Sequence, residues 1–365
     1  MRHLIHVFPS FAMGGSQARL IRLINHFNDR YSHSIVSMNG DYSAFDLIEK
    51  KSRVRRQSID LSRNKSSVNY LVYYRTKLRE QRPDVLLTYN WGSVDWAFAS
   101  LWLNLNHVLV EDGFGPEEAA VRFKRRSLAR GLIIRLNSSR VVVPSKTLSS
   151  IAINEWKVPL GRLSYIPNGV DSIRYKSAQE RGRSSIYAAD PTEVVVGTLA
   201  GLRPEKRLDL LIEAVAVVRQ THCARLVIAG SGPLDMELKN LCRFKGYDHW
   251  VTFLGFSESP EIVLSEFDIF ALSSMTEQLP ISMIEAMMSS LPVVSMDVGD
   301  VSASLPPEQG QWVIRESLDD FVNAIRKAVE NPYERRRLGA LNLKFALDRF
   351  ASAPMFNAWQ SIFDH

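Results

Sequence analysis

The stretch EVVVGTLAGLRPEKRLDLLIEAVAVVRQTHCARLVIAGSGP, from Glu193 to Pro233, contains one complete strand–helix–strand unit. Its first and last segments are short apolar runs rich in valine, leucine and isoleucine, the composition of strands that are covered on both faces. Between them, residues 207–220 carry apolar side chains at helical spacing. A helix between two such strands predicts a parallel α/β sheet.

The same alternation extends in both directions along the chain. The predicted strands are residues 3–8, 33–39, 84–90, 107–112 and 140–145 in the N-terminal half, and 193–200, 224–230, 251–256, 268–274, 291–297 and 311–314 in the C-terminal half. We therefore expect two Rossmann-like, doubly wound domains that face a cleft, with ligands at helix N-termini and strand carboxyl ends. The expected boundaries are 1–175 for the N-terminal domain, 176–192 for the connection, 193–345 for the second domain, and 346–365 for a helix that packs back towards the first.

Composition limits the class of protein. The chain has 365 residues, of which 45% are hydrophobic and 23% charged, and this suits a two-domain globular protein rather than a disordered one. Two cysteines, Cys223 and Cys242, form neither a disulfide framework nor a metal-ligand cluster. The N-terminus has no secretory-signal pattern, and no apolar run is long enough to span a membrane. These features predict a reducing, cytoplasmic setting.

The chain is basic, with a net charge of +6, which suits an anionic partner. The densest basic segment, residues 122–140, interleaves cations with apolar side chains, as in an amphipathic helix. One interpretation is a membrane-surface patch, and the other is an ordinary solvated helix face. Nucleic acid is disfavoured because no aromatic stacking pattern accompanies the charge. The candidate patch residues are Arg122, Lys124, Arg125, Arg126 and Arg130.

Glycines and cations follow several predicted strands. Gly14 and Gly15 lie between the first strand and its helix, where backbone can approach an anion, although a plain turn also fits. Arg203 and Lys206 follow the first strand of the second domain, and a guanidinium and an ammonium together suit a diphosphate. Gly232, in AGSGP, is by itself only a turn signal.

The segment TEQLPISMIEA, residues 276–286, contains two carboxylates around a predicted helix start. Pro280 suits the first turn of a helix, and the amides that follow Gln278 are free to bind an anion or a sugar hydroxyl. Glu277 and Glu285 could act as an acid/base pair, recognise sugar hydroxyls, or belong to a solvated face.

Taken in order, these motifs resemble those of retaining glycosyltransferases of the GT-B fold, in the large family-4 group. The resemblance spans nearly the whole chain. It is carried by Gly14–Gly15, the PNGVD at 167–171, the RPEK at 203–206, the GSGP at 230–233, the glutamates 277 and 285, and the PVV at 292–294.

The resemblance implies a hexosyl transfer from a nucleotide sugar, UDP favoured over GDP, to a hydroxyl. The implied acceptor is a lipid-linked or membrane-proximal glycan in surface polysaccharide or lipopolysaccharide assembly, at the inner face of the plasma membrane. No cofactor or metal is expected, since the chain has no D-x-D triplet. Alternatives on the same fold are a nucleotide-sugar epimerase and a sugar-phosphate synthase. A basic nucleic-acid-binding protein is a remote alternative.

The resemblance also implies roles for individual residues. Lys206 and Arg203 should hold the diphosphate, Glu285 the ribose and Glu277 the donor sugar. Asp112 stands near the place of a family histidine, and Gly201 stands where the family often has arginine. The implied catalytic residues are Glu277, Asp112, Lys206 and Arg203. The implied donor-binding residues are Gly14, Gly15, Arg203, Lys206, Gly232, Gln278, Leu279, Pro280, Ile281 and Glu285. The acceptor-binding candidates, at the ends of two N-terminal strands, are Tyr89, Asn90, Trp91, Asp112 and Gly113.

Overall fold

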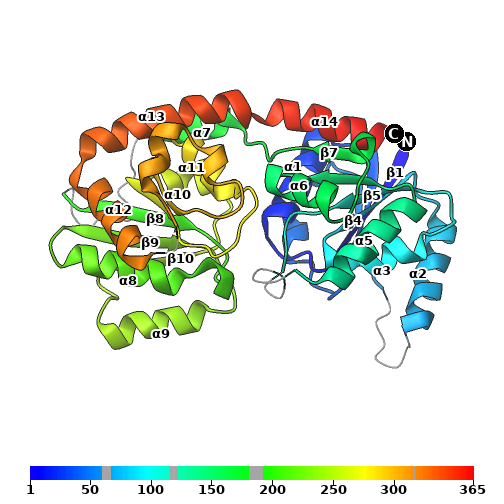
Figure 1. Ribbon diagram of the computed structural model, residues 1–365, viewed down its shortest axis with the longest axis horizontal. Coiled ribbons are helices and arrows are strands. Elements are labelled where there is room, and N and C mark those ends of the chain that lie inside the picture. The colour runs from blue at the N-terminus through cyan, green and yellow to red at the C-terminus, as the bar shows by residue number, and fades with distance from the viewer. Residues whose placement is uncertain (60–66, 116–117, 119–121, 181–191, 316) are drawn as a thin grey trace. The chain divides into compact units, whose positions relative to one another are not determined.

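A computed structural model describes residues 1–59, 67–115, 118, 122–180, 192–315 and 317–365. The chain divides into two compact units, Met1–Pro167 together with Pro354–His365, and Asn168–Ala353 (Figure 1). The division therefore falls before residue 175, where the sequence placed the end of the first domain. Helix α7 (Ser172–Glu180) belongs to the second unit and occupies the start of the expected connection. The rest of that connection up to residue 191 lies outside the described residues.

The first unit is built on a parallel sheet of seven strands in the order β3-β2-β1-β4-β5-β6-β7. The strands are β1 (Arg2–Phe8), β2 (Tyr31–Ser37), β3 (Val54–Arg56), β4 (Val85–Tyr89), β5 (Asn106–Val110), β6 (Arg140–Val143) and β7 (Leu163–Tyr165). Sequence analysis missed the two edge strands, β3 and β7. Each has three residues and includes polar side chains, so neither forms an apolar run.

Helices pack on this sheet and complete its core. They are α1 (Gly15–Phe27), α2 (Ser67–Gln81), α3 (Val94–Ala99), α5 (Lys124–Leu136), α6 (Lys146–Asn154) and α14 (Ser352–Asp364). The last helix, α14, buries Met355, Trp359, Ile362 and Phe363 in the same core as α1 and β1, because these four side chains share one helical face. The two chain ends meet there, and the Arg2 guanidinium donates to the Asp364 carbonyl (Figure 1).

The second unit contains a parallel sheet of six strands in the order β10-β9-β8-β11-β12-β13. Its strands are β8 (Val194–Leu199), β9 (Ala224–Ala229), β10 (Val251–Gly255), β11 (Ile269–Leu272), β12 (Val293–Met296) and β13 (Val313–Ile314). Its helices are α7, α8 (Leu208–Arg219), α9 (Asp235–Lys245), α10 (Pro260–Ser265), α11 (Ile281–Met288), α12 (Leu318–Glu330) and α13 (Pro332–Arg349). Two parallel, Rossmann-like α/β units confirm the predicted fold class.

The strand order reverses once in each sheet, and this places the functional loops. The chain runs outward from β1 to β3 and then returns to add β4 on the other side of β1; likewise β11 is added beside β8. The carboxyl ends of β1 and β4, and of β8 and β11, are therefore neighbours whose loops diverge. Ligands of open α/β sheets bind at such a reversal.

Three histidines, His6, His33 and His107, are buried inside the first sheet. His107 lies between Thr88 Oγ1, at 2.8 Å, and Ser139 Oγ, at 2.6 Å. His33 Nδ1 lies 3.0 Å from His6 Nε2. Burial disfavours the charged imidazole and lowers the pKa of both His33 and His107 to about 3.

We predict that acid destabilises the first unit through these histidines. Below the ordinary histidine pKa of about 6.5, the unfolded chain binds protons that the folded chain does not, so stability falls as the pH falls from there towards 3. His33 and His107 should each cost about 2 kcal/mol between pH 7 and pH 5. His107→Gln, which keeps hydrogen-bonding groups at this position, should flatten the pH dependence of the urea midpoint. His26→Gln, at an exposed histidine, is the matched control. If the urea midpoint of His107→Gln depended on pH as steeply as that of wild type, this account would be contradicted.

Candidate functional site

The strand-order reversal of the second unit brings a lysine and a glutamate together. Lys206 ends a short 3-10 turn after β8, and Glu277 lies in the loop after β11. The Lys206 Nζ donates to Glu277 Oε1 over 2.5 Å, and Ser274 Oγ donates to the same oxygen over 2.8 Å. Both long side chains keep some exposure, 22% for Lys206 and 12% for Glu277. A partly exposed lysine and glutamate thus form an ion pair at the carboxyl edge of the sheet.

The two loops are joined by further hydrogen bonds. Ser273 Oγ donates to the Lys206 carbonyl over 2.8 Å, and the Met275 amide donates to the Glu205 carbonyl over 2.8 Å. Arg203 precedes the 3-10 turn and is exposed. The loop after β9 lies directly against this segment, because a Cβ on Gly232 would come 2.5 Å from the Leu202 carbonyl oxygen. Glycine at that position is therefore a packing requirement.

The start of α11 is held from several sides. The Gln278 carbonyl accepts from the Asp300 amide over 2.9 Å, and the Leu279 carbonyl accepts from Asn168 Nδ2 over 2.9 Å. Pro280 is the N-cap residue, so the helix begins one residue later than the sequence suggested, at Ile281. On α11, Glu285 is only 6% exposed although its neighbours are apolar. A buried acid on an apolar helix is a candidate for binding rather than for solvation.

Gly299 supports this loop by close approach. It has a φ of +59°, and a Cβ there would lie 2.1 Å from the Glu277 carbonyl oxygen. Any side chain at this position would displace the backbone that carries Glu277.

We therefore predict that Gly299→Ala lowers stability by about 2 kcal/mol, through the left-handed backbone and the clash. Gly310→Ala is the matched control, because no atom lies within 4 Å of its added methyl group. The urea midpoints of the two variants give the comparison. Equal stability would show that the Glu277 loop is not packed as described.

In the first unit, the reversal lies between β1 and β4, and its loops touch. A Cβ on Gly92 would lie 2.8 Å from Pro9, so these loops pack backbone against side chain. Gly14 is the N-cap residue of α1, and Gly15 is exposed at the first position of the helix. Gln17 Nε2 donates to the Ser10 carbonyl over 2.7 Å and closes the loop on the helix.

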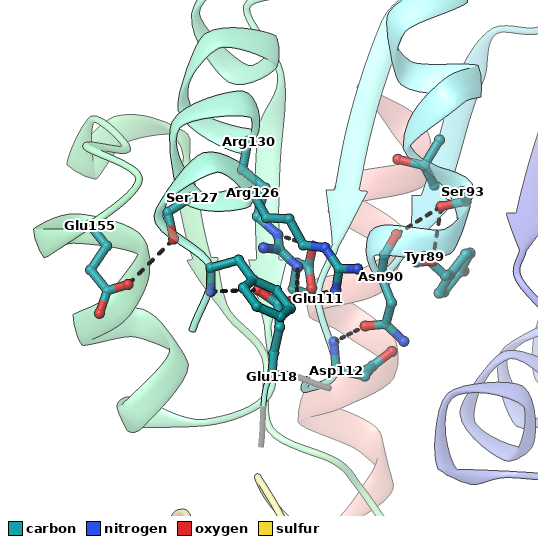
Figure 2. Close-up of polar contacts among 12 residues, drawn as sticks. Tyr89, Asn90, Ser93, Glu111, Asp112, Glu118, Arg126, Ser127, Arg130 and Glu155 are labelled. Atoms are coloured by element: carbon teal, nitrogen blue, oxygen red, sulfur yellow. Dashed lines mark hydrogen bonds and ion pairs between the residues drawn. The ribbon is translucent and has the colours of Figure 1, made fainter. Parts of the chain in front are cut away.

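Asn90 occupies a strained position at the end of β4. Its φ of 56° and ψ of 179° are nearly restricted to glycine and cost about 1–3 kcal/mol. Its backbone N–H donates to the Val110 carbonyl over 2.9 Å. Its side-chain Oδ1 accepts from the backbone N–H of Asp112 over 2.8 Å (Figure 2). Gly113, which follows, also has positive φ. Backbone strain of this kind concentrates at functional sites.

Asp112 is paired with a residue that the sequence did not single out. Arg19 of α1 donates to both carboxylate oxygens, over 2.5 and 2.8 Å, with only 3% of Arg19 and 14% of Asp112 exposed. Burial disfavours the Arg19 cation, but the Asp112 carboxylate outweighs burial and raises the pKa of Arg19. Both oxygens of Asp112 are therefore engaged, which suits an orienting carboxylate better than a free base. No spacing in the sequence links residues 19 and 112, so only the fold reveals the pair.

One predicted acceptor residue, Tyr89, is buried in the core instead of facing a ligand. Tyr89 is 1% exposed, stacks on Phe8 with 3.8 Å between ring centroids, and lies with its hydroxyl 3.1 Å from His6 Nδ1. It belongs to the core, because side chains at the end of β4 alternate between the two faces of the sheet. The Trp91 ring lies against the guanidinium groups of Arg126 and Arg130, at 5.4 and 5.0 Å from its centroid.

Those two arginines also correct the predicted basic patch. Arg130 is 1% exposed and donates to Glu111 Oε1 over 2.8 Å; Arg126 donates to Glu118 Oε2 over 3.1 Å (Figure 2). Burial raises the pKa of Glu111, and Arg130 opposes that shift. Arg126 and Arg130 therefore point inward from α5, whereas Lys124 and Arg125 are exposed, and Arg122 pairs with Glu155 over 2.6 Å.

Within the described residues, no group of three or more histidine, cysteine or acidic side chains is arranged to hold a metal ion. In the same part of the chain, no helix is both long and apolar enough to cross a bilayer.

In a comparison with known proteins, each unit matches a glycosyltransferase family model. Residues 183–343 match the family model described as glycosyl transferases group 1, and residues 13–174 match glycosyltransferase family 4. A structure of the Anabaena protein HepE in complex with UDP-glucose superposes with a TM-score of 0.81 over 100% of both chains, at 19% identity. The chain has the GT-B fold and carries both glycosyltransferase domains.

Curated relatives match parts of the chain. A poly(ribitol-phosphate) alpha-N-acetylglucosaminyltransferase of Staphylococcus aureus is 26% identical over 47% of this chain and 36% of its own length. An O-antigen biosynthesis glycosyltransferase of Escherichia coli is 23% identical over 66% of each chain. The chain thus spans between about a third and two thirds of the length of these two relatives.

Proposed function

We propose that this GT-B glycosyltransferase moves a hexosyl group from a UDP-sugar to a hydroxyl of a surface glycan, with retention of anomeric configuration. The Lys206–Glu277 pair at the strand-order reversal of the second unit carries the proposal. A nucleotide sugar is anionic at its diphosphate and rich in hydroxyls at its sugar, so it suits a cation beside a carboxylate. In this proposal, Lys206 exchanges Glu277 for the diphosphate, and Glu277 then accepts from a sugar hydroxyl.

Negative charge develops on the leaving diphosphate during transfer, and cations placed there stabilise it. Lys206 and the exposed Arg203 take this role, with the amides at the start of α11 as further donors. Glu285 accepts from the donor ribose. These groups need no metal ion for the step we propose. Solved neighbours with UDP or UDP-glucose support UDP as the nucleotide.

We assign acceptor binding to Asn90, Asp112 and Gly113, with Trp91 beside them. The bond between the anomeric carbon and the diphosphate oxygen breaks, and the acceptor oxygen bonds to that carbon on the same face. The acceptor proton passes to the departing diphosphate oxygen. Asp112, held by Arg19, orients the hydroxyl rather than taking its proton. The S. aureus and E. coli relatives support a surface glycan as the acceptor class.

We predict that a UDP-sugar raises the unfolding temperature in the presence of EDTA as well as in its absence. Lys206→Ala should weaken this ligand by about 10- to 100-fold, the value of a charge-assisted hydrogen bond. Lys245→Ala, at an exposed ion pair of the same unit, is the matched control. Equal affinity in Lys206→Ala and wild type, or no response to any nucleotide sugar, would overturn the donor assignment. Product anomeric configuration, determined by NMR, tests retention separately.

We also predict that a substitution at Asn90 weakens acceptor binding without changing the reaction of the donor. Asn90→Gly removes the side-chain carboxamide and also relieves the backbone strain, so the fold should persist. The KM for the acceptor should rise about tenfold. Hydrolysis of the UDP-sugar without acceptor should be unchanged. Asn104→Gly, at an exposed asparagine with positive φ in the same unit, is the control. An unchanged acceptor KM in Asn90→Gly would remove this residue from the acceptor site.

A further inference from the structure

Helix α5 buries Ile133 and Ile134, as an ordinary surface helix would, but its arginines and leucines are placed the other way round. Arg126 and Arg130 point towards the carboxylates of Glu118 and Glu111 (Figure 2), and both guanidinium groups lie against the Trp91 ring. Its leucines point the other way: Leu128, Leu132 and Leu136 are 72, 51 and 46% exposed. A surface helix normally buries its apolar stripe and exposes its cations. The arrangement here indicates that something other than water covers the outer face.

The exposed face has a defined chemistry. Lys124, Leu128, Leu132 and Leu136 are spaced four apart and form one row along the helix. Arg125 and Arg135 are exposed on the same side, three residues from Leu128 and Leu132 respectively. The helix sequence, KRRSLARGLIIRL, contains no acidic residue. The outer face therefore combines an apolar row with flanking positive charge.

A tryptophan extends this surface. Trp102, in the turn between α3 and β5, is 76% exposed and has a φ of +62°. The end of α5 holds that turn: Asn137 Nδ2 donates to the Ala97 carbonyl over 2.9 Å and to Ser100 Oγ over 2.8 Å. Trp102 comes two residues after Ser100, and Asn137 comes directly after Leu136, so this contact brings the indole near the Leu136 end of the row. An indole kept in water by a strained turn is costly, and tryptophan is the residue most enriched at membrane interfaces.

We propose that this surface, the three leucines with Trp102 and the flanking cations, docks onto an anionic lipid bilayer. The leucines and the indole enter the boundary between headgroups and acyl chains, and Lys124, Arg125 and Arg135 meet lipid phosphates. Charge complementarity favours this occupant, since lipid phosphates are negative and no acidic side chain interrupts the helix. The docking surface differs from the patch predicted from sequence, because Arg130 is buried and Arg126 is turned towards Glu118.

The inference deepens the proposed function and depends on it only for its biological role. The outer face of α5 carries the leucines, and its inner face contacts Trp91 beside the proposed acceptor residues. A helix with its side chains is about 10 Å across. Docking by α5 would therefore keep the acceptor loops of the first unit close to the bilayer, where a lipid-linked glycan presents its hydroxyls.

Vesicle flotation of the purified full-length chain tests the proposal. The chain should float with phosphatidylcholine vesicles that contain phosphatidylglycerol, more weakly with phosphatidylcholine alone, and less as salt rises. The double variant Trp102→Asn, Leu132→Gln should lower partitioning by about tenfold or more, because both side chains lose their apolar burial. Arg125→Ser with Arg135→Ser should remove the preference for anionic vesicles. Phe244→Gln is the control, since Phe244 is 89% exposed in the second unit.

Three outcomes would overturn the proposal. The first is wild-type protein that fails to float, and the second is a Trp102→Asn, Leu132→Gln variant that floats as wild type does. The third is self-association without lipid that the same variant abolishes, which would assign the surface to a second copy of the chain. UDP-sugar binding is measured on the same samples. Wild-type protein that floats with vesicles but binds no UDP-sugar would contradict the proposed function and leave the docking proposal standing.

Discussion

The reversal of strand order in each parallel sheet is the constraint on which the candidate site depends. Parallel strands need crossovers, and the chain builds each sheet outward from its first strand in one direction and then in the other. In the second unit this makes β8 and β11 neighbours and lets Lys206 reach Glu277, 71 residues away in sequence. In the first unit the loops after β1 and β4 meet in the same way. The chemistry is thus brought together by topology rather than by sequence proximity.

Charge burial organises the first unit around that reversal. Arg130 pairs with Glu111 (Figure 2) and lies against the Trp91 ring. Arg19 pairs with Asp112, whose backbone amide donates to Asn90. Ion pairs this deep are costly to form and more costly to break, because the remaining partner would be left as an unpaired buried charge. They fix α5 and α1 against the end of β5. In α5 this leaves the leucines outside, so the buried pairs and the proposed lipid-docking surface are two consequences of one helix orientation.

The sequence predicted the fold and the second-unit loops well, and the first-unit site less well. Apolar runs located every strand except the two short edge strands, β3 and β7, whose polar side chains hide them. The order of motifs also pointed to Lys206 and Glu277, which the structure brings into contact. Composition could not show that Arg130 turns inward, because its partner Glu111 lies on a different element. For the same reason Arg19 was missed, and Tyr89 was misplaced because a strand end does not reveal which face a side chain takes.

The most direct test of the central claim, that the donor diphosphate binds at the Lys206–Glu277 reversal, is amide hydrogen exchange with and without UDP. Exchange would be followed by mass spectrometry in peptides covering residues 200–207 and 273–285. The account predicts protection in both peptides on UDP binding, and loss of that protection in Lys206→Ala. Protection confined to other segments, or unchanged protection in Lys206→Ala, would contradict it.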